Sequence, residues 1–340
     1  MSAPPALPHE QPGTTQPAVS SAAPAASAGG TSRPWWRWLK RGVTLAFFLI
    51  VAVFTVRYAR NVDWSEVWQS IVETPHGVLL GAAVLAACSH ALYSCFDLLG
   101  RRYTGHGLPV AKVMQVNFIS YAFNLNMGSL VGGVAFRYRM YSRLGLGYAT
   151  ITRVITLSML TNWLGYLLLA GAVFAVAPLP LPPHWKMSSD GLQWLGAGLL
   201  ALAAVYLVLC VTAKERSITV RGHELMLPRP RMAALQVLMS CSNWLIMGSI
   251  IFVLLQGKVA YPAVLSVLLV AAVAGVVTHV PAGLGVLEAV FVALLSHQVS
   301  EGRLLGALLT YRALYYIAPL MLAALLYAVF EAKGKATSKA

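Results

Sequence analysis

Long, uninterrupted apolar stretches recur along this chain of 340 residues and constrain its fold more than any other feature. Several are about 20 residues long, which is the length that an α-helix needs to cross the hydrocarbon core of a bilayer. Their apolar residues are continuous rather than alternating, and this disfavours a transmembrane β-barrel. With 58% hydrophobic and only 11% charged residues, the chain is too apolar for a single soluble core. The sequence therefore predicts an all-α, polytopic integral membrane protein.

Charged loops between the apolar stretches predict the topology. The chain has 25 Lys and Arg against 11 Asp and Glu, and much of the resulting net charge of +14 lies in short loops. Because Lys and Arg accumulate in cytoplasmic loops, we expect a bacterial inner-membrane protein with both termini in the cytoplasm. Such loops also attract anionic lipid headgroups, whereas their pattern does not suit nucleic acid. For most of these residues a purely topological role is the better interpretation, because such a bias occurs in membrane proteins of every function.

We expect about eight transmembrane helices and one re-entrant or broken segment. Residues 1–32 are predicted to be a disordered Ala/Pro/Ser-rich cytoplasmic tail, residues 33–332 the membrane domain, and residues 333–340 a basic cytoplasmic tail. A full span at residues 110–134 would place the following arginines outside the cell, so this segment is predicted to be re-entrant. The predicted spans cover approximately residues 42–56, 78–99, 154–177, 191–213, 232–256, 259–287, 284–296 and 304–330.

A first polar cluster, residues 117–143, combines amides, glycines and arginines. Amides within a span are costly without partners, so they either cross-link helices or face a hydrated path. Guanidinium groups suit bidentate binding of phosphate. Helix cross-links and topological arginines are the alternative, which explains one or two such residues better than this density. The candidates are Asn117, Asn124, Asn126, Arg137, Arg139 and Arg143 for a lipid-headgroup path, and Gly128, Gly132 and Gly133 for a broken helix.

A second polar cluster contains another predicted break in a helix. An acidic residue at membrane depth is a functional candidate, and an arginine inside an apolar segment needs a carboxylate, carbonyls or a lipid phosphate. A structural ion pair between Glu288 and Arg312 and a role in lipid binding are therefore both open. The candidates are Glu288, Tyr311 and Arg312 for the headgroup path, and Pro281, Gly283 and Gly285 for the break. Because both clusters share one plan, an internal inverted repeat is a further expectation.

Few residues suit catalysis. The four cysteines fall in predicted spans without metal-type spacing, so we interpret them as packing residues. Asp97 and His90 are seven residues apart on one helix face, and packing or anchoring explains them best. An enzyme acting on lipid would need clustered acids, histidines or a metal set at membrane depth. We therefore expect no enzyme activity, no catalytic residue, no metal and no cofactor.

The two clusters resemble the flippase-like transmembrane region of the lysylphosphatidylglycerol synthase family. Matching runs are residues 121–143, 279–290 and 308–320, with E-L-M-L-P from Glu224, and the similarity covers roughly residues 40–332. The combination of P-x-G-L-G-V-x-E with Y-R-x-x-Y-Y is more specific than either motif alone. In two-domain members, the resemblance implies that this region moves aminoacylated phosphatidylglycerol between leaflets while a separate domain attaches the amino acid. Since the chain stops at Ala340, we expect a stand-alone member without aminoacyl transfer.

The sequence therefore predicts a lipid-handling protein, either a flippase or a transporter of anionic or aminoacylated phospholipid or a related envelope lipid. In this hypothesis, Glu288 orients Arg312 or carries a proton, and the broken segments move. Phosphate is held by Arg137, Arg139, Arg143 and Arg312. The alternative is a non-transporting partner or regulator of envelope-lipid synthesis. Expected partners are phospholipid, a second copy of the chain, or envelope-lipid enzymes.

Overall fold

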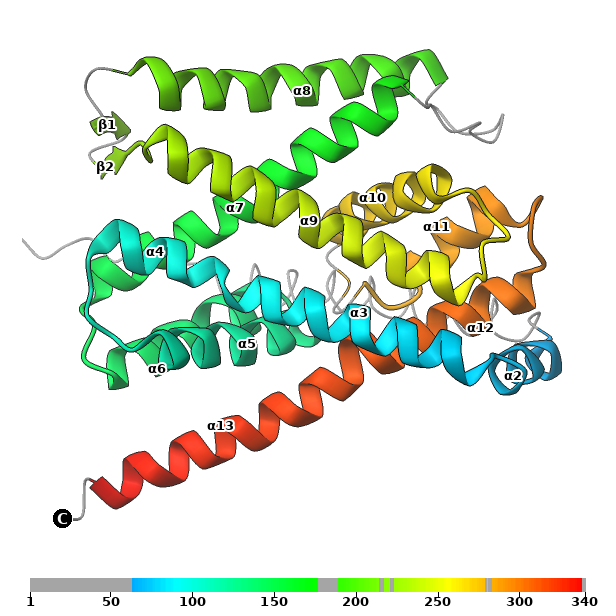
Figure 1. Ribbon diagram of the computed structural model, residues 1–340, viewed down its shortest axis with the longest axis horizontal. Helices are drawn as coiled ribbons and strands as arrows, with labels where there is room; N and C mark the ends of the chain where they lie inside the picture. Colours follow the sequence, from blue (N-terminus) through cyan, green and yellow to red (C-terminus); the bar gives the residue numbers. More distant parts are fainter. Residues whose placement is uncertain are drawn as a thin grey trace, which may run out of the picture. The chain divides into compact units, whose positions relative to one another are not determined.

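The computed structural model describes residues 63–176, 189–213, 217–220, 223–278, 280 and 283–337 (Figure 1). The predicted tail at 1–32, the predicted span at 42–56 and the candidate Pro281 lie outside these residues. The helices and strands are α2 Trp64–Val72, α3 His76–Ser94, α4 Phe96–Thr104, α5 Val110–Met127, η1 Ser129–Ala135, α6 Phe136–Arg143, α7 Tyr148–Val176, α8 Ser189–Thr212, β1 Ser217–Val220, β2 His223–Met226, α9 Pro230–Leu254, α10 Tyr261–Thr278, α11 Val286–Leu295, α12 Glu301–Arg312, η3 Ala313–Ile317 and α13 Ala318–Thr337. The two η elements are π-helices.

Six helical runs among the described residues are long and apolar enough to cross a bilayer, which confirms the helical, polytopic membrane fold. They are His76–Thr104, Tyr148–Val176, Asp190–Thr212, Pro230–Leu254, Tyr261–Thr278 and Glu301–Ala332. The predicted span at residues 284–296 is instead the 10-residue α11. At 1.5 Å per residue, α11 covers about 15 Å, which is about half of the hydrocarbon core. The described residues therefore do not reproduce the predicted count of eight spans.

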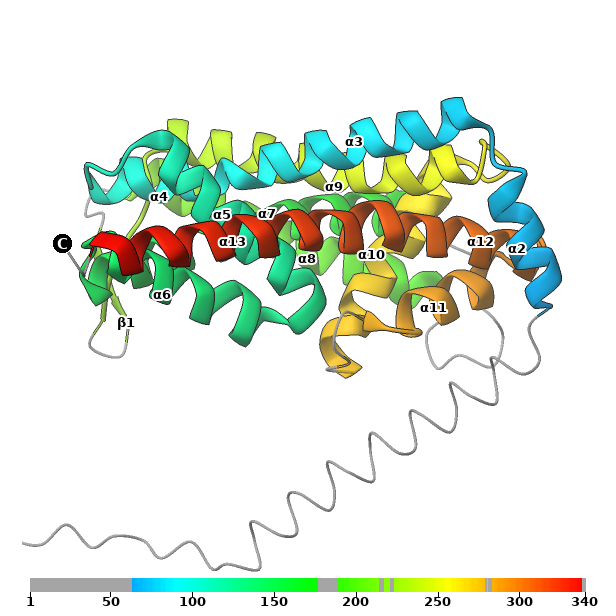
Figure 2. The ribbon, with the colours of Figure 1, turned by 90° about the horizontal axis from the view of Figure 1, so that it is seen from below.

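The segment predicted to be re-entrant is a helical hairpin made of α5, η1 and α6. Helix α5 ends at Gly128, whose φ of 84° and ψ of 169° favour glycine. The returning arm lies so close to α5 that a Cβ on Gly132 would be 2.1 Å from the backbone nitrogen of Asn124. Helix α5 begins and helix α6 ends at the same end of the bundle, so the hairpin enters and leaves on one side (Figure 2).

Helices α10 and α11 form a second hairpin. Its turn contains Gly283 and Gly285, whose φ angles of 55° and 76° lie in the left-handed region. The residues just before α10 and just after α11 line one common pocket, so this hairpin also enters and leaves at the same end of the bundle. That end is the one opposite to the ends of the first hairpin (Figure 2).

Two parts of the chain share one arrangement, a helical run, a hairpin and a second helical run. In the first part these are α3–α4, the first hairpin and α7; in the second part, after α8, they are α9, the second hairpin and α12–α13. Because three crossing helices separate the two hairpins, the second unit runs in the opposite direction to the first. This is the arrangement expected of an inverted repeat, in which broken segments from the two halves enter from opposite faces.

A short amphipathic helix, α2, lies at the end of the bundle where the second hairpin enters (Figure 2). Its Trp64 and Trp68 side chains are exposed, whereas Val67 is buried against the bundle. The carboxylate of Asp63 caps the helix by accepting hydrogen bonds from the backbone N–H groups of Ser65 and Glu66. The Ser65 hydroxyl also donates to this carboxylate, and that bond contributes most to a lowered pKa of Asp63. The cap is therefore ionised and intact at neutral pH.

Candidate functional site

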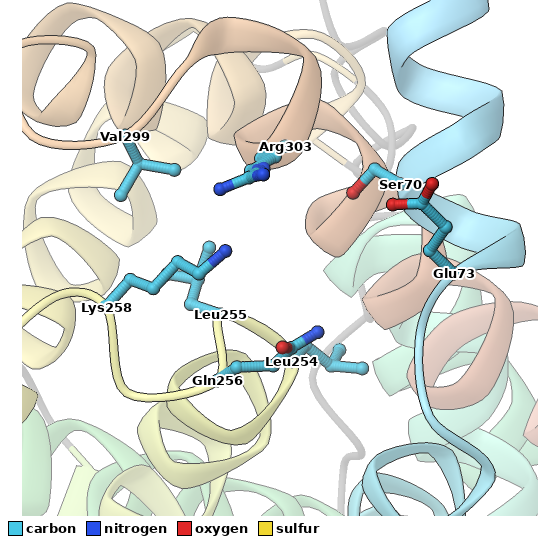
Figure 3. A pocket seen from close by; sticks show the side chains of 8 residues that line it. All are labelled: Ser70, Glu73, Leu254, Leu255, Gln256, Lys258, Val299 and Arg303. Atoms are coloured by element: carbon cyan, nitrogen blue, oxygen red, sulfur yellow. The ribbon is translucent and has the colours of Figure 1, made fainter.

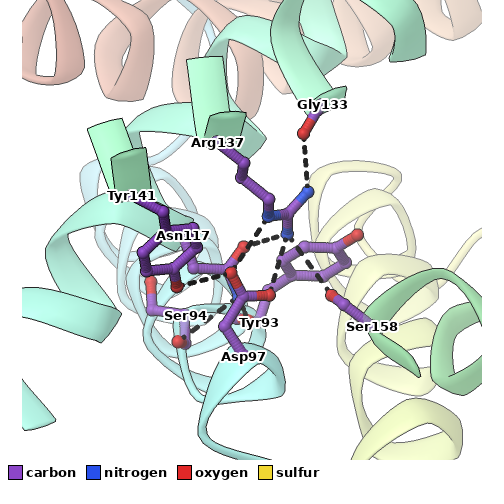
Figure 4. Close-up of polar contacts among 8 residues, drawn as sticks. All are labelled: Tyr93, Ser94, Asp97, Asn117, Gly133, Arg137, Tyr141 and Ser158. Carbon is purple, nitrogen blue, oxygen red and sulfur yellow. Dashed lines mark hydrogen bonds and ion pairs between the residues drawn. The ribbon is translucent and has the colours of Figure 1, made fainter. Parts of the chain in front are cut away.

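Arg137 forms a buried ion pair with Asp97, between the first hairpin and α4 (Figure 4). Its Nε donates to Asp97 Oδ2 at 3.0 Å and its NH2 to Asp97 Oδ1 at 3.2 Å, so the contact is bidentate. NH1 donates to the carbonyl of Gly133 at 3.0 Å, and NH2 also donates to the Asn117 side chain. Tyr141 donates to the same carboxylate at 2.8 Å. The hairpin is thereby fixed to α4.

This geometry corrects the role expected for Arg137. The Arg137 and Asp97 side chains are only 3% and 0% exposed, and the guanidinium is directed at protein acceptors. A phosphate could reach it only by displacing a bidentate carboxylate from a closed site. The sequence missed this pair because its two members are 40 residues apart, and because packing alone had seemed sufficient for Asp97.

Arg312 forms the second buried ion pair, with Glu288 of α11. Its Nε donates to Glu288 Oε1, and its NH2 donates to Glu288 Oε2 at 3.0 Å and to the carbonyl of Gly283 at 2.8 Å. The guanidinium carbon lies 5.3 Å from the centre of the Tyr316 ring, which adds a cation–π contact. The ion pair that the sequence left as one alternative is confirmed. It joins the start of the π-helix η3 to the turn of the second hairpin.

A column of tyrosines connects the regions of the two ion pairs. Tyr93, whose carbonyl accepts a bond from Asn117, stacks on Tyr121 with ring centres 3.5 Å apart. Tyr121 and Tyr315 share a hydrogen bond of 2.9 Å between their hydroxyls, and Tyr315 stacks on Tyr311 at 5.2 Å. Tyr311 directly precedes Arg312. Buried polar networks of this kind make the packing of a membrane bundle specific.

Tyr311 differs from its neighbours in this column. The side chain is fully buried, and its hydroxyl has no hydrogen-bond partner within the described part of the chain. Buried hydroxyls are nearly always paired, so Tyr311 is an exception within the described part of the chain. The Tyr311 ring contacts the Tyr316 ring edge-on at 5.8 Å, and Tyr316 also carries the cation–π contact with Arg312.

Two amides of the first cluster, Asn117 and Asn126, cross-link helices, which is the alternative interpretation given above. Asn117 donates to the carbonyl of Tyr93 at 2.7 Å and thereby ties α5 to α3. Asn126 donates to the carbonyl of Tyr316 at 3.3 Å and ties α5 to η3. Asn124 packs against the glycines of the returning arm, where a Cβ on Gly133 would lie 3.1 Å from its Oδ1. These three residues shape the hairpin.

Arg139 and Arg143 lie away from the buried pairs, towards the far end of α6. Both contact Glu331 of α13, with Arg139 Nε 2.8 Å from Oε1 and Arg143 NH1 2.5 Å from Oε2. Their side chains are 54% and 38% exposed, so water competes for these ion pairs. Unlike Arg137, they are accessible to a headgroup.

Three acids, Asp97, Glu288 and Glu331, are thus held by arginines. In the part of the chain that the structure describes, no group of three or more His, Cys, Asp or Glu lies close enough to hold a metal ion.

Comparison with known proteins places this geometry in a family. The model of the lysylphosphatidylglycerol synthase TM region matches residues 42–323. The chain is 50% identical to inner membrane protein YbhN of Escherichia coli (strain K12) over 305 residues, 89% of this chain and 96% of the relative. It is 32% identical to the uncharacterized protein slr0712 of Synechocystis over 78% of this chain and 84% of that protein. Phosphatidylglycerol lysyltransferase of Staphylococcus haemolyticus is 22% identical over 84% of this chain, which spans only 33% of that enzyme.

Proposed function

The chain belongs to the family of the lysylphosphatidylglycerol synthase transmembrane region, and from this premise we propose that it moves an anionic or aminoacylated phospholipid between the leaflets of the bacterial inner membrane. The observation that carries the proposal is the pair of re-entrant hairpins, entering from opposite ends and each held by a buried arginine–carboxylate pair. Broken segments of this kind surround the substrate path in transporters with inverted repeats.

The second ion pair is the better candidate for contact with lipid. The Arg312 and Glu288 side chains are 10% and 11% exposed, compared with 3% and 0% for Arg137 and Asp97. A headgroup phosphate that takes the place of Glu288 would satisfy the guanidinium equally well, since both ligands bind it bidentately. The same exchange would loosen the bond from Arg312 to Gly283 and release the turn of the hairpin.

The exposed arginines give the path an entrance. Arg139 and Arg143 are proposed to attract the phosphate at the end of the bundle that carries the arginine-rich loops, which we place in the cytoplasm. The phosphatidylglycerol named in the lysyltransferase relatives supports this choice of lipid class. We propose no covalent change in the lipid, and expect the lipid recovered after the assay below to be chemically unchanged by mass spectrometry.

The test is lipid movement by the purified chain in liposomes. Fluorescent phosphatidylglycerol is incorporated in both leaflets, and the fraction reached by an impermeant reductant is compared with that in protein-free vesicles. We expect the wild type to expose label from the inner leaflet, and Arg312→Ala and Glu288→Gln to expose much less. Arg153→Gln, an exposed arginine of α7 outside the ion pairs described above, is the matched control.

One result would overturn the proposal. If the wild type leaves the inner leaflet protected with and without a proton gradient, and with other lipids, the chain does not move lipid. It would then fit a non-transporting partner of envelope-lipid enzymes.

A further inference from the structure

A pocket lies at the end of the bundle opposite to the arginine-rich loops, where the second hairpin enters. Three elements line it: the C-terminal part of α2, the turn between α9 and α10, and the start of α12 (Figure 3). Its empty space is about 500 Å³, including space open to solvent. The lining residues are Ser70, Glu73, Leu254, Leu255, Gln256, Lys258, Val299 and Arg303.

The pocket has an apolar floor and a cationic rim. Leu254, Leu255 and Val299 are buried, whereas Lys258 and Arg303 are exposed. Figure 3 shows the side chains of Lys258 and Arg303 directed into the same space from opposite walls. Within the described part of the chain, neither cation forms an ion pair. Two cations converging on one space favour an anion.

The pocket contains a single carboxylate, which does not neutralise these cations. Glu73 accepts a hydrogen bond of 2.8 Å from the side chain of Gln69, one turn earlier on α2. No ion pair links Glu73 to Lys258 or Arg303 in the described structure, although all three line the pocket. The rim therefore keeps a net positive charge.

The backbone of the α9–α10 turn is strained at the pocket. Gln256 has a φ of 54°, the only positive φ at a non-glycine position among the described residues. Glycine would adopt this conformation without strain, and Gly257 follows directly with a φ of 68°. Strained residues of this kind concentrate at ligand-binding sites. A glutamine side chain at this position can donate to a ligand, which a glycine cannot do.

Helix α2 indicates the depth of the pocket in the membrane. Trp64 and Trp68 are 52% and 68% exposed and lie one turn apart on the face turned away from the bundle. Tryptophans on an amphipathic helix settle at the level of lipid headgroups. Because Ser70 and Glu73 of the same helix line the pocket, the pocket opens at headgroup level.

We infer that this pocket binds a phosphate group, and that its source is the headgroup of an anionic phospholipid in the leaflet at this end of the bundle. Lys258 and Arg303 neutralise the phosphate, and Gln256 and Ser70 donate hydrogen bonds to it. This inference rests on the proposed lipid function and gives it a second headgroup site, opposite to Arg139 and Arg143.

The test is site-specific cross-linking of the full-length purified chain in nanodiscs. Phosphatidylglycerol with a photoactivatable headgroup is irradiated, and cross-links to peptides containing residues 254–258 and 299–303 are quantified by mass spectrometry. We expect the double variant Lys258→Gln/Arg303→Gln to lower these cross-links about tenfold, because two solvent-exposed charge contacts are lost. Arg153→Gln, a charge change at the opposite end, should leave them unchanged.

Gln256→Gly separates binding from folding. Glycine accepts the φ of 54° without strain, so this variant should melt no lower than the wild type while its cross-links decrease. Unchanged cross-links in both Gln256→Gly and the double variant would overturn the inference, as would labelling confined to other parts of the chain.

Excess inorganic phosphate distinguishes the two sources of the anion. If it displaces the lipid label at comparable concentration, the pocket selects a free anion and the headgroup assignment is wrong. The result of the liposome assay does not depend on the result of this cross-linking assay. Cross-links in the pocket without lipid movement would reject transport but support headgroup binding in the pocket. Lipid movement without these cross-links would support transport but reject headgroup binding in the pocket.

Discussion

Removing one member of the Arg137–Asp97 pair should destabilise the protein more than removing both. In Asp97→Leu, the Arg137 guanidinium stays in a site that is 3% exposed and loses both of its carboxylate bonds. Breaking a buried pair in this way costs about 3–5 kcal/mol of unfolding free energy. Tyr141 also loses its acceptor, which adds about 1–3 kcal/mol. Arg137→Met should cost a similar amount, because it leaves the Asp97 carboxylate unpaired.

The double variant Asp97→Leu/Arg137→Met leaves no buried charge. Apolar replacement of a buried ion pair is often close to neutral, so the remaining cost is that of unpaired Tyr141 and Asn117, about 1–3 kcal/mol each. The two single losses should therefore exceed the double loss by several kcal/mol. Unfolding by sodium dodecyl sulfate in mixed micelles, followed by circular dichroism, measures all four proteins of this cycle.

Arg139→Met is the control for these variants, since the side chain is 54% exposed and its ion pair with Glu331 is open to water. The reasoning would be refuted if Asp97→Leu cost no more than Arg139→Met, or if the double variant lost the sum of the single losses. In the first case Arg137 would not depend on Asp97 and could serve as a phosphate ligand. Lipid movement would then fall in Arg137→Met at unchanged stability.

Two further predictions concern the first hairpin and the topology. Gly132→Ala should prevent the hairpin from closing, because its Cβ would lie 2.1 Å from the nitrogen of Asn124; we expect a large fall in melting temperature, whereas Gly147→Ala, with no atom within 4 Å, should change it little. In a cysteine-free background, Gln298→Cys should react with an impermeant maleimide on intact spheroplasts, and Ser142→Cys only after permeabilisation. The reverse labelling pattern would invert the predicted orientation.

The sequence predicted the elements whose signal is local. Apolar stretches of membrane length predicted α8 and α9 to within about two residues at each end, and α7 to within about six. The glycines and the following arginines identified the first hairpin, because a full span there conflicts with the positive-inside rule. The pairing of Glu288 with Arg312 could also be predicted from the sequence, since few charged residues lie at membrane depth and each needs a partner.

The remaining features depend on contacts between distant segments. Nothing near Asp97 in the sequence indicates that Arg137, 40 residues later, occupies its carboxylate. The tyrosine column joins α3, α5 and η3, so no single stretch of sequence contains it. The length of α11 was also obscured, because a hairpin turn at membrane depth and a full span have similar apolar composition. In each case tertiary packing decides, and a pattern along the chain carries no direct signal of it.

Each hairpin is held by an arginine, a carboxylate and a backbone carbonyl, but these three groups come from different segments in the two hairpins. In each, an arginine donates both to a carbonyl near the break, Gly133 or Gly283, and to a carboxylate from another segment. In the first hairpin the arginine belongs to the hairpin and the acid to α4. Both side chains of this ion pair are buried inside the bundle. In the second, the acid belongs to the hairpin and Arg312 lies outside it, at the start of a π-helix, a feature frequent at functional sites. Under the proposed function, an anion that competes for Arg312 would free the second hairpin itself, whereas the first hairpin would stay anchored. We therefore expect the second hairpin to respond to lipid and the first to remain fixed in the bundle.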